Sequence, residues 1–400
     1  MAWFLKNPLD FQAHNADVAA LWSDYHDGRP HRVPVRIVGS IRNLIQNPDL
    51  NDTGFTFQDF FTDPEAQIRC QLAYQKWCRY HVLCDNEMGP PKDGWLLGVD
   101  FQNSYDAGWF GCPLHYDGNA VPDTIEILKE NKNKLYDMEC PDPLSGGLME
   151  RVVEFYEYMH ERCGNLEFEG LPVRAPTTIP GEGSDGPLDA AYKLRGAAEV
   201  CMDMLTDPDY YHDLMEFITT SLIRRMKAIR EWLCVRHPNS LEKGQFQRPN
   251  FTFADDAVVL LSLDQYQEFV FPYHNRMVQE FSDGGRIGIH LCGNATRFFR
   301  FMRDHLNVYS FDTGFPVDLG LVRRELGPEV EILGGPTVML IKDGPISKIQ
   351  AEVRDICESG IMEGRKFIFI TANNMAPGTP VEHIESFYEA VKQFGRYEST

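Results

Sequence analysis

Residues 286–294 read Arg-Ile-Gly-Ile-His-Leu-Cys-Gly-Asn, a short apolar run with a histidine and a cysteine just before a glycine. Alternate side chains of a β-strand point to the same face, so a strand here directs His290 and Cys292 the same way. An imidazole and a thiolate on one face can bind the same zinc ion. In the alternative interpretation, Cys292 is a small buried hydrophobic residue and His290 a hydrogen-bonded core histidine. The place of this strand in the fold decides between the two.

Strand-like segments of this kind recur along the chain, and from about residue 250 they alternate regularly with amphipathic helical segments. Short strands with Gly-, Asp- or Asn-rich exits and intervening helices are typical of a parallel sheet with crossover helices. Eight such strands predict an α/β protein with a (β/α)8 TIM barrel, and a doubly wound sheet is the alternative. The predicted strands are residues 33–39, 80–85, 166–179, 250–256, 286–291, 308–312, 330–334 and 366–370.

The remaining segments predict additions to a single barrel domain spanning residues 1–400. Residues 1–30 are polar with one amphipathic stretch, and they predict an N-terminal helical arm. Residues 90–124, after the second strand, form a long Gly- and aromatic-rich insertion, and loops of this length are usually functional. We expect the insertion to be a lid whose Tyr105 and Trp109 bind a flat apolar substrate, with ordinary packing of these aromatics as the alternative.

The composition indicates which kinds of partner and which cellular compartment to expect. The formal net charge of −21 argues against nucleic acid, because a phosphate backbone requires a basic face. No run of 18 or more apolar residues occurs, so we expect no membrane span. The ten cysteines are scattered without any Cys-x-x-Cys, and the first residues lack the order of a signal peptide. These features predict a cytoplasmic protein with reduced thiols.

The ends of the predicted strands gather polar side chains. In a TIM barrel the reactive groups lie at the carboxyl ends of the strands, so we expect these side chains to surround His290 and Cys292. A zinc ion needs a third protein ligand, and Asp312 is the first choice, with Glu182 second. Some of these acids are helix caps in the alternative interpretation. The candidate substrate-binding residues at strand ends are Asp85, Glu182, Asn373 and Asn374.

Residues 181–186, Gly-Glu-Gly-Ser-Asp-Gly, also match the spacing of a dinucleotide-binding loop. Pro187 follows at once, and the stretch around Asp203 is helical, so no second strand supplies a carboxylate for a ribose. We therefore do not predict a Rossmann site here.

Three segments resemble the uroporphyrinogen decarboxylase superfamily. They are residues 253–273, the stretch His290-Leu-Cys-Gly-Asn294, and residues 376–383, which read Ala-Pro-Gly-Thr-Pro-Val-Glu-His. The likeness covers roughly residues 200–400 well and the first half loosely. That superfamily has a (β/α)8 barrel, in agreement with the strand count.

Two branches of the superfamily compete for this chain. The decarboxylases carry an arginine-rich motif after the first strand, where residues 34–41 here have glycine and serine in place of the key arginine and glutamine. Their late histidine is replaced by Asn373 and Asn374. The loss of positive charge disfavours a porphyrinogen with several carboxylates. The resemblance therefore favours the corrinoid-dependent methyltransferases, which share the His-x-Cys pair and bind zinc.

Within that branch, the enzymes that methylate coenzyme M have a further cysteine after the last strand, where Asn373 stands here. The resemblance thus implies a substrate-demethylating component that works with a separate corrinoid-binding protein. Zinc held by His290, Cys292 and Asp312 would draw charge from the methyl-bearing oxygen. Asp255 or Asp256 would instead protonate that oxygen as a catalytic acid.

The predicted function is a zinc-dependent transfer of a methyl group from a small O-methylated, methoxyaromatic substrate to the cobalt of a corrinoid (cobalamin) carried by the partner. Three alternatives stay open. They are a decarboxylase acting on another polycarboxylate, a methylcobamide:thiol methyltransferase, and a barrel that binds ligands without catalysis.

Overall fold

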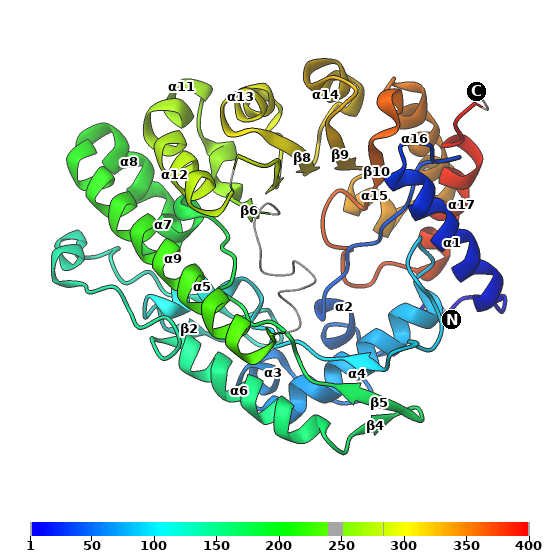
Figure 1. The fold of residues 1–400 in the computed structure, drawn as a ribbon, viewed down its shortest axis with the longest axis horizontal. Helices are drawn as coiled ribbons and strands as arrows, with labels where there is room; N and C mark the ends of the chain where they lie inside the picture. The colour runs from blue at the N-terminus through cyan, green and yellow to red at the C-terminus, as the bar shows by residue number, and fades with distance from the viewer. Residues whose placement is uncertain (1, 239–250, 283, 399–400) are drawn as a thin grey trace.

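A five-stranded parallel sheet forms the most regular part of the fold. The structure is a computed structural model that describes residues 2–238, 251–282 and 284–398 of the 400-residue chain. In the sheet, neighbouring strands are consecutive in the sequence, so the chain crosses back outside the sheet after each one (Figure 1). The strands, in spatial order from one edge, are β10 (Phe367–Phe369), β9 (Glu331–Gly334), β8 (Val308–Thr313), β7 (Ile287–Leu291) and β6 (Thr252–Ala254).

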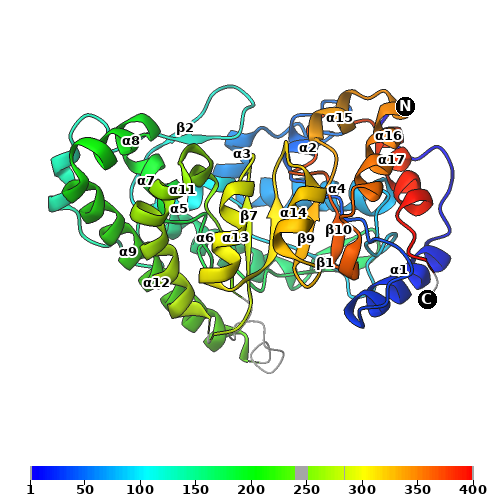
Figure 2. The ribbon, with the colours of Figure 1, turned by 90° about the horizontal axis from the view of Figure 1, so that it is seen from above.

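The crossover helices cover the outer face of this sheet (Figures 1 and 2). Several contain buried apolar side chains on one side, as expected for amphipathic helices that pack on a sheet. Asn250, the first residue of the fourth predicted strand, lies outside the described residues. The elements between and after the strands are η3 (Asp256–Leu260), α11 (Leu263–Gln265), η4 (Tyr266–Val270), α12 (Phe271–Phe281), α13 (Thr296–Leu306), α14 (Leu319–Leu326), α15 (Val338–Asp343), α16 (Ile346–Glu358), η5 (Glu363–Arg365) and α17 (Val381–Phe394).

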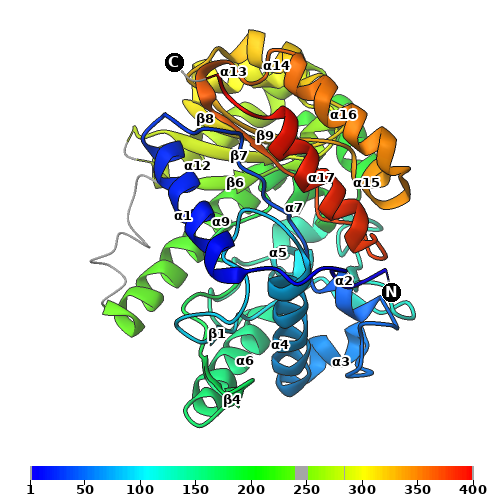
Figure 3. The same cartoon turned by 90° about the vertical axis from the view of Figure 1, so that its right-hand side faces the viewer.

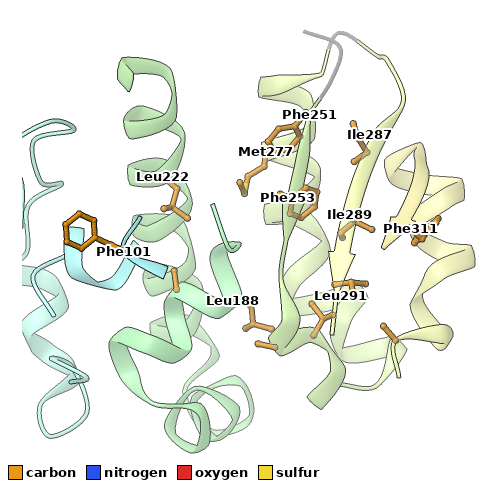
Figure 4. Close-up of a cluster of buried hydrophobic side chains, with 14 of the residues drawn as sticks. Phe101, Leu188, Leu222, Phe251, Phe253, Met277, Ile287, Ile289, Leu291 and Phe311 are labelled. Carbon is orange, nitrogen blue, oxygen red and sulfur yellow. The ribbon is translucent and has the colours of Figure 1, made fainter. Parts of the chain in front are cut away.

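Strand β7 shows why the sequence pattern produces this arrangement. Ile287, Ile289 and Leu291 are at most 2% exposed, and they lie in the apolar layer that contains Met277 of α12 (Figure 4). Burial of one such side chain contributes roughly 1.5–3 kcal/mol, so the alternation fixes which face of the strand meets the helices. His290 points to the opposite face.

Residues 33–37 extend the sheet beyond β10. Val35 forms a parallel bridge with Phe369, and the Arg36 N–H donates to the Phe369 carbonyl at 2.8 Å. The Asp85 N–H in turn donates to the Val35 carbonyl at 2.8 Å. The first two predicted strands are therefore single bridges and hydrogen bonds, and α4 (Pro64–His81) continues through the start of the second one.

The third predicted strand, residues 166–179, is divided between two short strands of a separate sheet. That sheet has the order β1-β5-β4, with β1 (Trp95–Leu96) parallel to β5 (Leu171–Arg174) and β4 (Glu167–Phe168) antiparallel to it. Among the described residues, no ladder joins this sheet to β6 to close a ring. The α/β architecture and the parallel sheet agree with the predicted barrel class.

The predicted N-terminal helical arm is present as α1 (Phe11–His26). Asp10 caps it by accepting a hydrogen bond from the Ala13 N–H at 3.0 Å. The helix lies beside α17, so the two ends of the described chain meet on one side of the molecule (Figures 1 and 3). Trp22 attaches α1 to the second strand position through its indole N–H, which donates to the Asp85 carbonyl at 2.7 Å.

The predicted lid, residues 90–124, is a set of short elements packed into the core. Trp95, Phe101, Trp109 and Phe110 are at most 4% exposed. The Phe101 ring packs on Phe155 and the Phe110 ring packs on Phe217, with ring centroids 5.2 and 5.8 Å apart. The expectation that Trp109 forms a substrate-binding wall is therefore wrong. Besides β1, this segment contains η1 (Gln102–Ser104), α5 (Tyr105–Trp109), β2 (Leu114–His115) and β3 (Asp123–Thr124).

The N-terminal half is otherwise helical. None of the helices in the described ranges is both long enough and apolar enough to cross a membrane. The remaining elements of this half are α2 (Arg42–Ile45), α3 (Phe57–Thr62), η2 (Lys132–Asp137), α6 (Leu148–Cys163), α7 (Pro187–Arg195), α8 (Ala197–Thr206) and α9 (Pro208–Arg236).

Candidate metal centre

His290 and Cys292 meet at the carboxyl end of β7. The His290 Nε2 atom lies 3.2 Å from the Cys292 Sγ atom, and both residues are partly buried. The predicted proximity of the two side chains is confirmed. Their distance follows from the strand, because residues two apart share a face and Gly293 then turns the chain away with φ of +71°.

Asp256 supplies the third potential ligand. One ligand atom each from Asp256, His290 and Cys292 lie within 4.8 Å of one another. The Asp256 Oδ1 atom accepts a hydrogen bond from the Cys292 N–H at 2.7 Å and lies 3.9 Å from His290 Nε2. A nitrogen, a sulfur and a carboxylate oxygen are the donor types that zinc accepts, and three protein ligands leave a position open for chemistry. The residues present therefore fit a catalytic zinc ion.

Asp312 contacts the other side of the imidazole. The parallel register pairs His290 of β7 with Asp312 of β8, and the Asp312 Oδ2 atom lies 3.0 Å from His290 Nδ1. A carboxylate on the far nitrogen of a metal-binding histidine fixes the tautomer and the orientation of the ring. The structure thus favours Asp256 over Asp312 as third ligand, which corrects the first choice made from the sequence.

Asn373 reaches the same group from the loop after β10. Its Nδ2 atom lies 3.0 Å from Cys292 Sγ, so a residue 81 positions away faces the thiol. The neighbouring Asn374 is exposed, and its backbone N–H donates to Asn373 Oδ1 at 2.6 Å. Of the two asparagines predicted at this strand end, Asn373 is the one whose side chain enters the centre.

The charges at the centre are coupled. Burial disfavours the charged imidazole, but the hydrogen bonds and negative charges of Asp312 and Cys292 outweigh burial and raise the pKa of His290 to about 11. Burial raises the pKa of the Cys292 thiol above its usual value, although the bond to His290 opposes this. Metal ligands must lose these protons, so a metal ion that bound here would release them.

Asp255, predicted as a catalytic acid, is completely buried. Its carboxylate accepts hydrogen bonds from the backbone N–H groups of Leu188 at 3.0 Å and Asp189 at 2.8 Å. Its Oδ2 atom also lies 2.8 Å from Nε2 of the buried His274. With both oxygens occupied and no exposed surface, Asp255 anchors α7 to the end of β6 and does not meet a substrate. The catalytic prediction for Asp255 is wrong for this reason.

Asp189 completes a reciprocal contact between the same two segments. Its carboxylate accepts hydrogen bonds from the backbone N–H groups of Asp256 and Ala257, both at 2.9 Å. Residues 181–186 lead into α7 here, and a Cβ on Gly186 would lie 2.3 Å from the Ala254 carbonyl. The glycine-rich stretch is therefore a close-packed loop that positions Asp256. Sequence reasoning missed Asp189 and His274, because neither stands at a predicted strand end.

Three other candidates lie in different surroundings. Asp85 is fully buried and accepts two hydrogen bonds from Arg32, at 2.6 and 2.7 Å, so its predicted contact with substrate is not supported. Glu182 has a buried Oε2 atom without a hydrogen-bond partner among the described residues, and burial raises its pKa. The Tyr105 hydroxyl donates to Asp185 at 3.2 Å. Substrate contacts of Glu182 and Tyr105 stay predictions.

Comparison with known proteins identifies the family. A sequence model described as uroporphyrinogen decarboxylase (URO-D) matches residues 251–394, which contain β6 to β10, Asp256, His290, Cys292 and Asn373. This match places residues 251–394 in the uroporphyrinogen decarboxylase family. The resemblance of the His-x-Cys segment and the C-terminal segment is thereby confirmed.

Two relatives match most of the length of this chain. It is 28% identical over 335 residues to a methylated-thiol–coenzyme M methyltransferase of Methanosarcina mazei, covering 82% of this chain and 79% of that protein. It is 24% identical over 354 residues to a uroporphyrinogen decarboxylase of Thermosynechococcus vestitus, covering 86% and 89% respectively. The first of these two similarities, which has the higher identity, supports the methyltransferase branch.

A solved structure shares the fold. A methyltransferase from Methanosarcina mazei superposes with a TM-score of 0.61 and 16% sequence identity, over 94% of this chain and 98% of that one. At this identity the likeness supports the fold alone. The 28% identical relative assigns the chain to the methyltransferases, as the sequence predicted.

Proposed function

We propose that this methyltransferase is zinc-dependent and moves a methyl group from an O-methylated aromatic substrate to the cobalt of a corrinoid carried by a separate protein. The observation that carries the proposal is the cluster of Asp256, His290 and Cys292 at adjoining strand ends, with ligand atoms within 4.8 Å. Active sites of barrel enzymes lie at these ends. In the described part of the chain, the Asn373 amide and not a second thiol contacts Cys292, and this favours oxygen as the atom that bears the methyl group.

When bound, zinc would act as a Lewis acid on the methyl-bearing oxygen. His290, Cys292 and Asp256 would hold the ion, and Asp312 would hold the His290 ring through Nδ1. The Asp189 carboxylate fixes the backbone of Asp256. These contacts keep the three ligand side chains in place before a substrate arrives, which is the condition for efficient electrostatic catalysis.

The proposed transfer is a displacement at the methyl carbon, in which one bond to carbon breaks as another forms. The methyl–oxygen bond breaks with its electron pair left on oxygen, and water supplies the proton that completes the hydroxyl product. The partner's reduced corrinoid would supply the electron pair that accepts the methyl group, and it would be formally oxidised by two electrons. The role of Asp256 as a proton donor, the other sequence prediction for it, competes with its role as a ligand.

A second candidate function is transfer from a methylated thiol. It is favoured by the 28% identical relative, whose name specifies a methylated thiol and coenzyme M. Incubation of the purified enzyme with reduced cobalamin and matched panels of methoxyarenes and methyl thioethers distinguishes the two functions. Formation of methylcobalamin with methoxyarenes supports the first proposal, and formation with thioethers alone supports the second.

Metal analysis tests the centre itself. We expect stoichiometric zinc in the wild type and in two matched control variants, His305→Ala and Cys234→Ala, which change a histidine and a cysteine of helices α13 and α9. His290→Ala and Cys292→Ala should each lower zinc affinity by at least about 100-fold, because each removes a ligand. Wild-type protein that binds no stoichiometric metal would reject the proposal. Release of CO2 from uroporphyrinogen would instead support the decarboxylase alternative.

A further inference from the structure

The Asn373 side chain has a fixed orientation toward the Cys292 sulfur. Its Oδ1 atom accepts the Asn374 backbone N–H at 2.6 Å, so the amide oxygen is already occupied. The Nδ2 group therefore faces Cys292, with Nδ2 3.0 Å from Sγ. The Thr371 hydroxyl donates to the Asn373 backbone carbonyl at 2.8 Å and holds the loop in the same position. The amide thus donates a hydrogen bond to the sulfur.

The hydrogen bond has an electrostatic consequence for a bound metal. A neutral His290 with ionised Cys292 and Asp256 carries two negative charges, which match a divalent cation. Asn373 adds no charge, and its N–H stabilises negative charge on the thiolate sulfur. A thiolate that shares its charge with a donor gives less electron density to the metal. A metal ion bound here would therefore withdraw more charge from a substrate oxygen atom than it would without this hydrogen bond.

Resting on the proposed function, we propose that Asn373 is a specificity-determining residue that acts through Cys292 and reserves the centre for methyl groups carried on oxygen. An alkoxide or phenoxide is a more basic leaving group than the corresponding thiolate, so its departure depends more strongly on charge withdrawal. Loss of the Asn373 N–H should therefore slow transfer from oxygen more than transfer from sulfur. Asn373 is a positioning residue in this account, because it touches a ligand and no reacting atom.

Cobalt(II) in place of zinc provides a readout that is independent of activity. We would load the wild type, Asn373→Ala, the near-isosteric Asn373→Asp, and Asn133→Ala, which changes an exposed asparagine of η2. The sulfur-to-cobalt charge-transfer band should move to longer wavelength in both Asn373 variants, because their sulfur is more electron-rich. The band of the control should match the wild type, and all four proteins should bind stoichiometric cobalt.

The zinc-loaded proteins then test specificity. The ratio of kcat/KM for a methoxyarene to kcat/KM for the matching methylthioarene should fall about tenfold in both Asn373 variants, a size typical of changes next to a metal ligand. If wild-type protein binds metal and demethylates the methoxyarene but the band and the ratio are unchanged in Asn373→Asp, this inference is overturned and the proposed function stands. If the wild type binds no metal or transfers no methyl group, the proposed function is rejected, and this inference, which rests on it, is rejected as well.

Discussion

The two halves of the chain position their important side chains by different means. In residues 251–394 a continuous parallel ladder pairs Ala254 with His290 and His290 with Asp312, so backbone register brings the site residues together. In the part of the chain before β6, the first predicted strand makes only a single bridge with the sheet, and buried ion pairs hold this part together. Arg32 pairs with Asp85 there, and Arg225 pairs with Asp106.

The difference shows what each kind of contact can support. A regular ladder leaves its strand-end side chains available for ligands, as with His290 and Cys292. A buried carboxylate such as Asp85 has no such freedom, because an uncompensated charge in the interior is costly and must keep its partners. Asp85 therefore has a structural role, whereas His290 and Cys292 at the end of β7 remain available to a ligand.

Removal of a buried charge should have the largest effect. Asp85→Ala leaves Arg32 without its buried carboxylate partner, with only the more distant Asp17 at 3.4 Å, and should lower the free energy of unfolding by about 3–5 kcal/mol. Urea unfolding measures the change, and the exposed Asp93→Ala should stay within about 0.5 kcal/mol of the wild type. A stable Asp85→Ala protein would remove the contrast between the halves, and it would restore Asp85 as a candidate for substrate binding.

A change beside the ladder should affect the metal more than the fold. Asp312→Asn keeps the shape but weakens the bond to His290 Nδ1, so zinc affinity should fall by about 10–100-fold. Competition with a chromophoric chelator measures this affinity. If affinity instead drops as far as in His290→Ala, Asp312 is itself a ligand and the assignment of Asp256 is in error.

The pH dependence of stability should report on Asp189. Burial and the neighbouring Asp255 and Asp256 charges raise the pKa of Asp189 to about 8, well above that of an unfolded aspartate. Between these two pKa values the folded state holds a proton that the unfolded state has lost, so stability falls as the pH rises toward 8. The slope from this group is at most about 1.4 kcal/mol per pH unit. Unfolding at several pH values should show a smaller slope in Asp189→Asn, and equal slopes would contradict the assignment.

The smallest effect is expected in the predicted lid. The Trp109 indole N–H donates to the Asp142 carbonyl at 2.9 Å, and Trp109→Phe removes that bond while it keeps an aromatic ring in the core. The loss should be about 1 kcal/mol by urea unfolding, with KM for the methyl donor unchanged. A raised KM with unchanged stability would mean that Trp109 contacts the substrate after all.

Sequence reasoning predicted the regular half well and the irregular half poorly. The strands around residues 286–291, 308–312, 330–334 and 366–370 correspond to β7, β8, β9 and β10, because apolar alternation and glycine exits are local signals. The prediction of a strand at residues 80–85 was wrong, because α4 continues through His81 and the remaining contacts are made by side chains distant in the sequence. The prediction of a substrate-binding lid at residues 90–124 did not hold for Trp109, because aromatic content alone does not distinguish a packed core from a binding surface.

By itself, the sequence determined that His290 and Cys292 share one face of a strand, since strand geometry has a period of two residues. The choice among the acids was decided only by the tertiary structure. Asp255 and Asp256 are adjacent in the chain, yet one is sealed against α7 and the other lies at the centre. Asn373 meets Cys292 across 81 residues for the same reason. Contacts between distant segments depend on the packing of the whole chain, which no local pattern encodes.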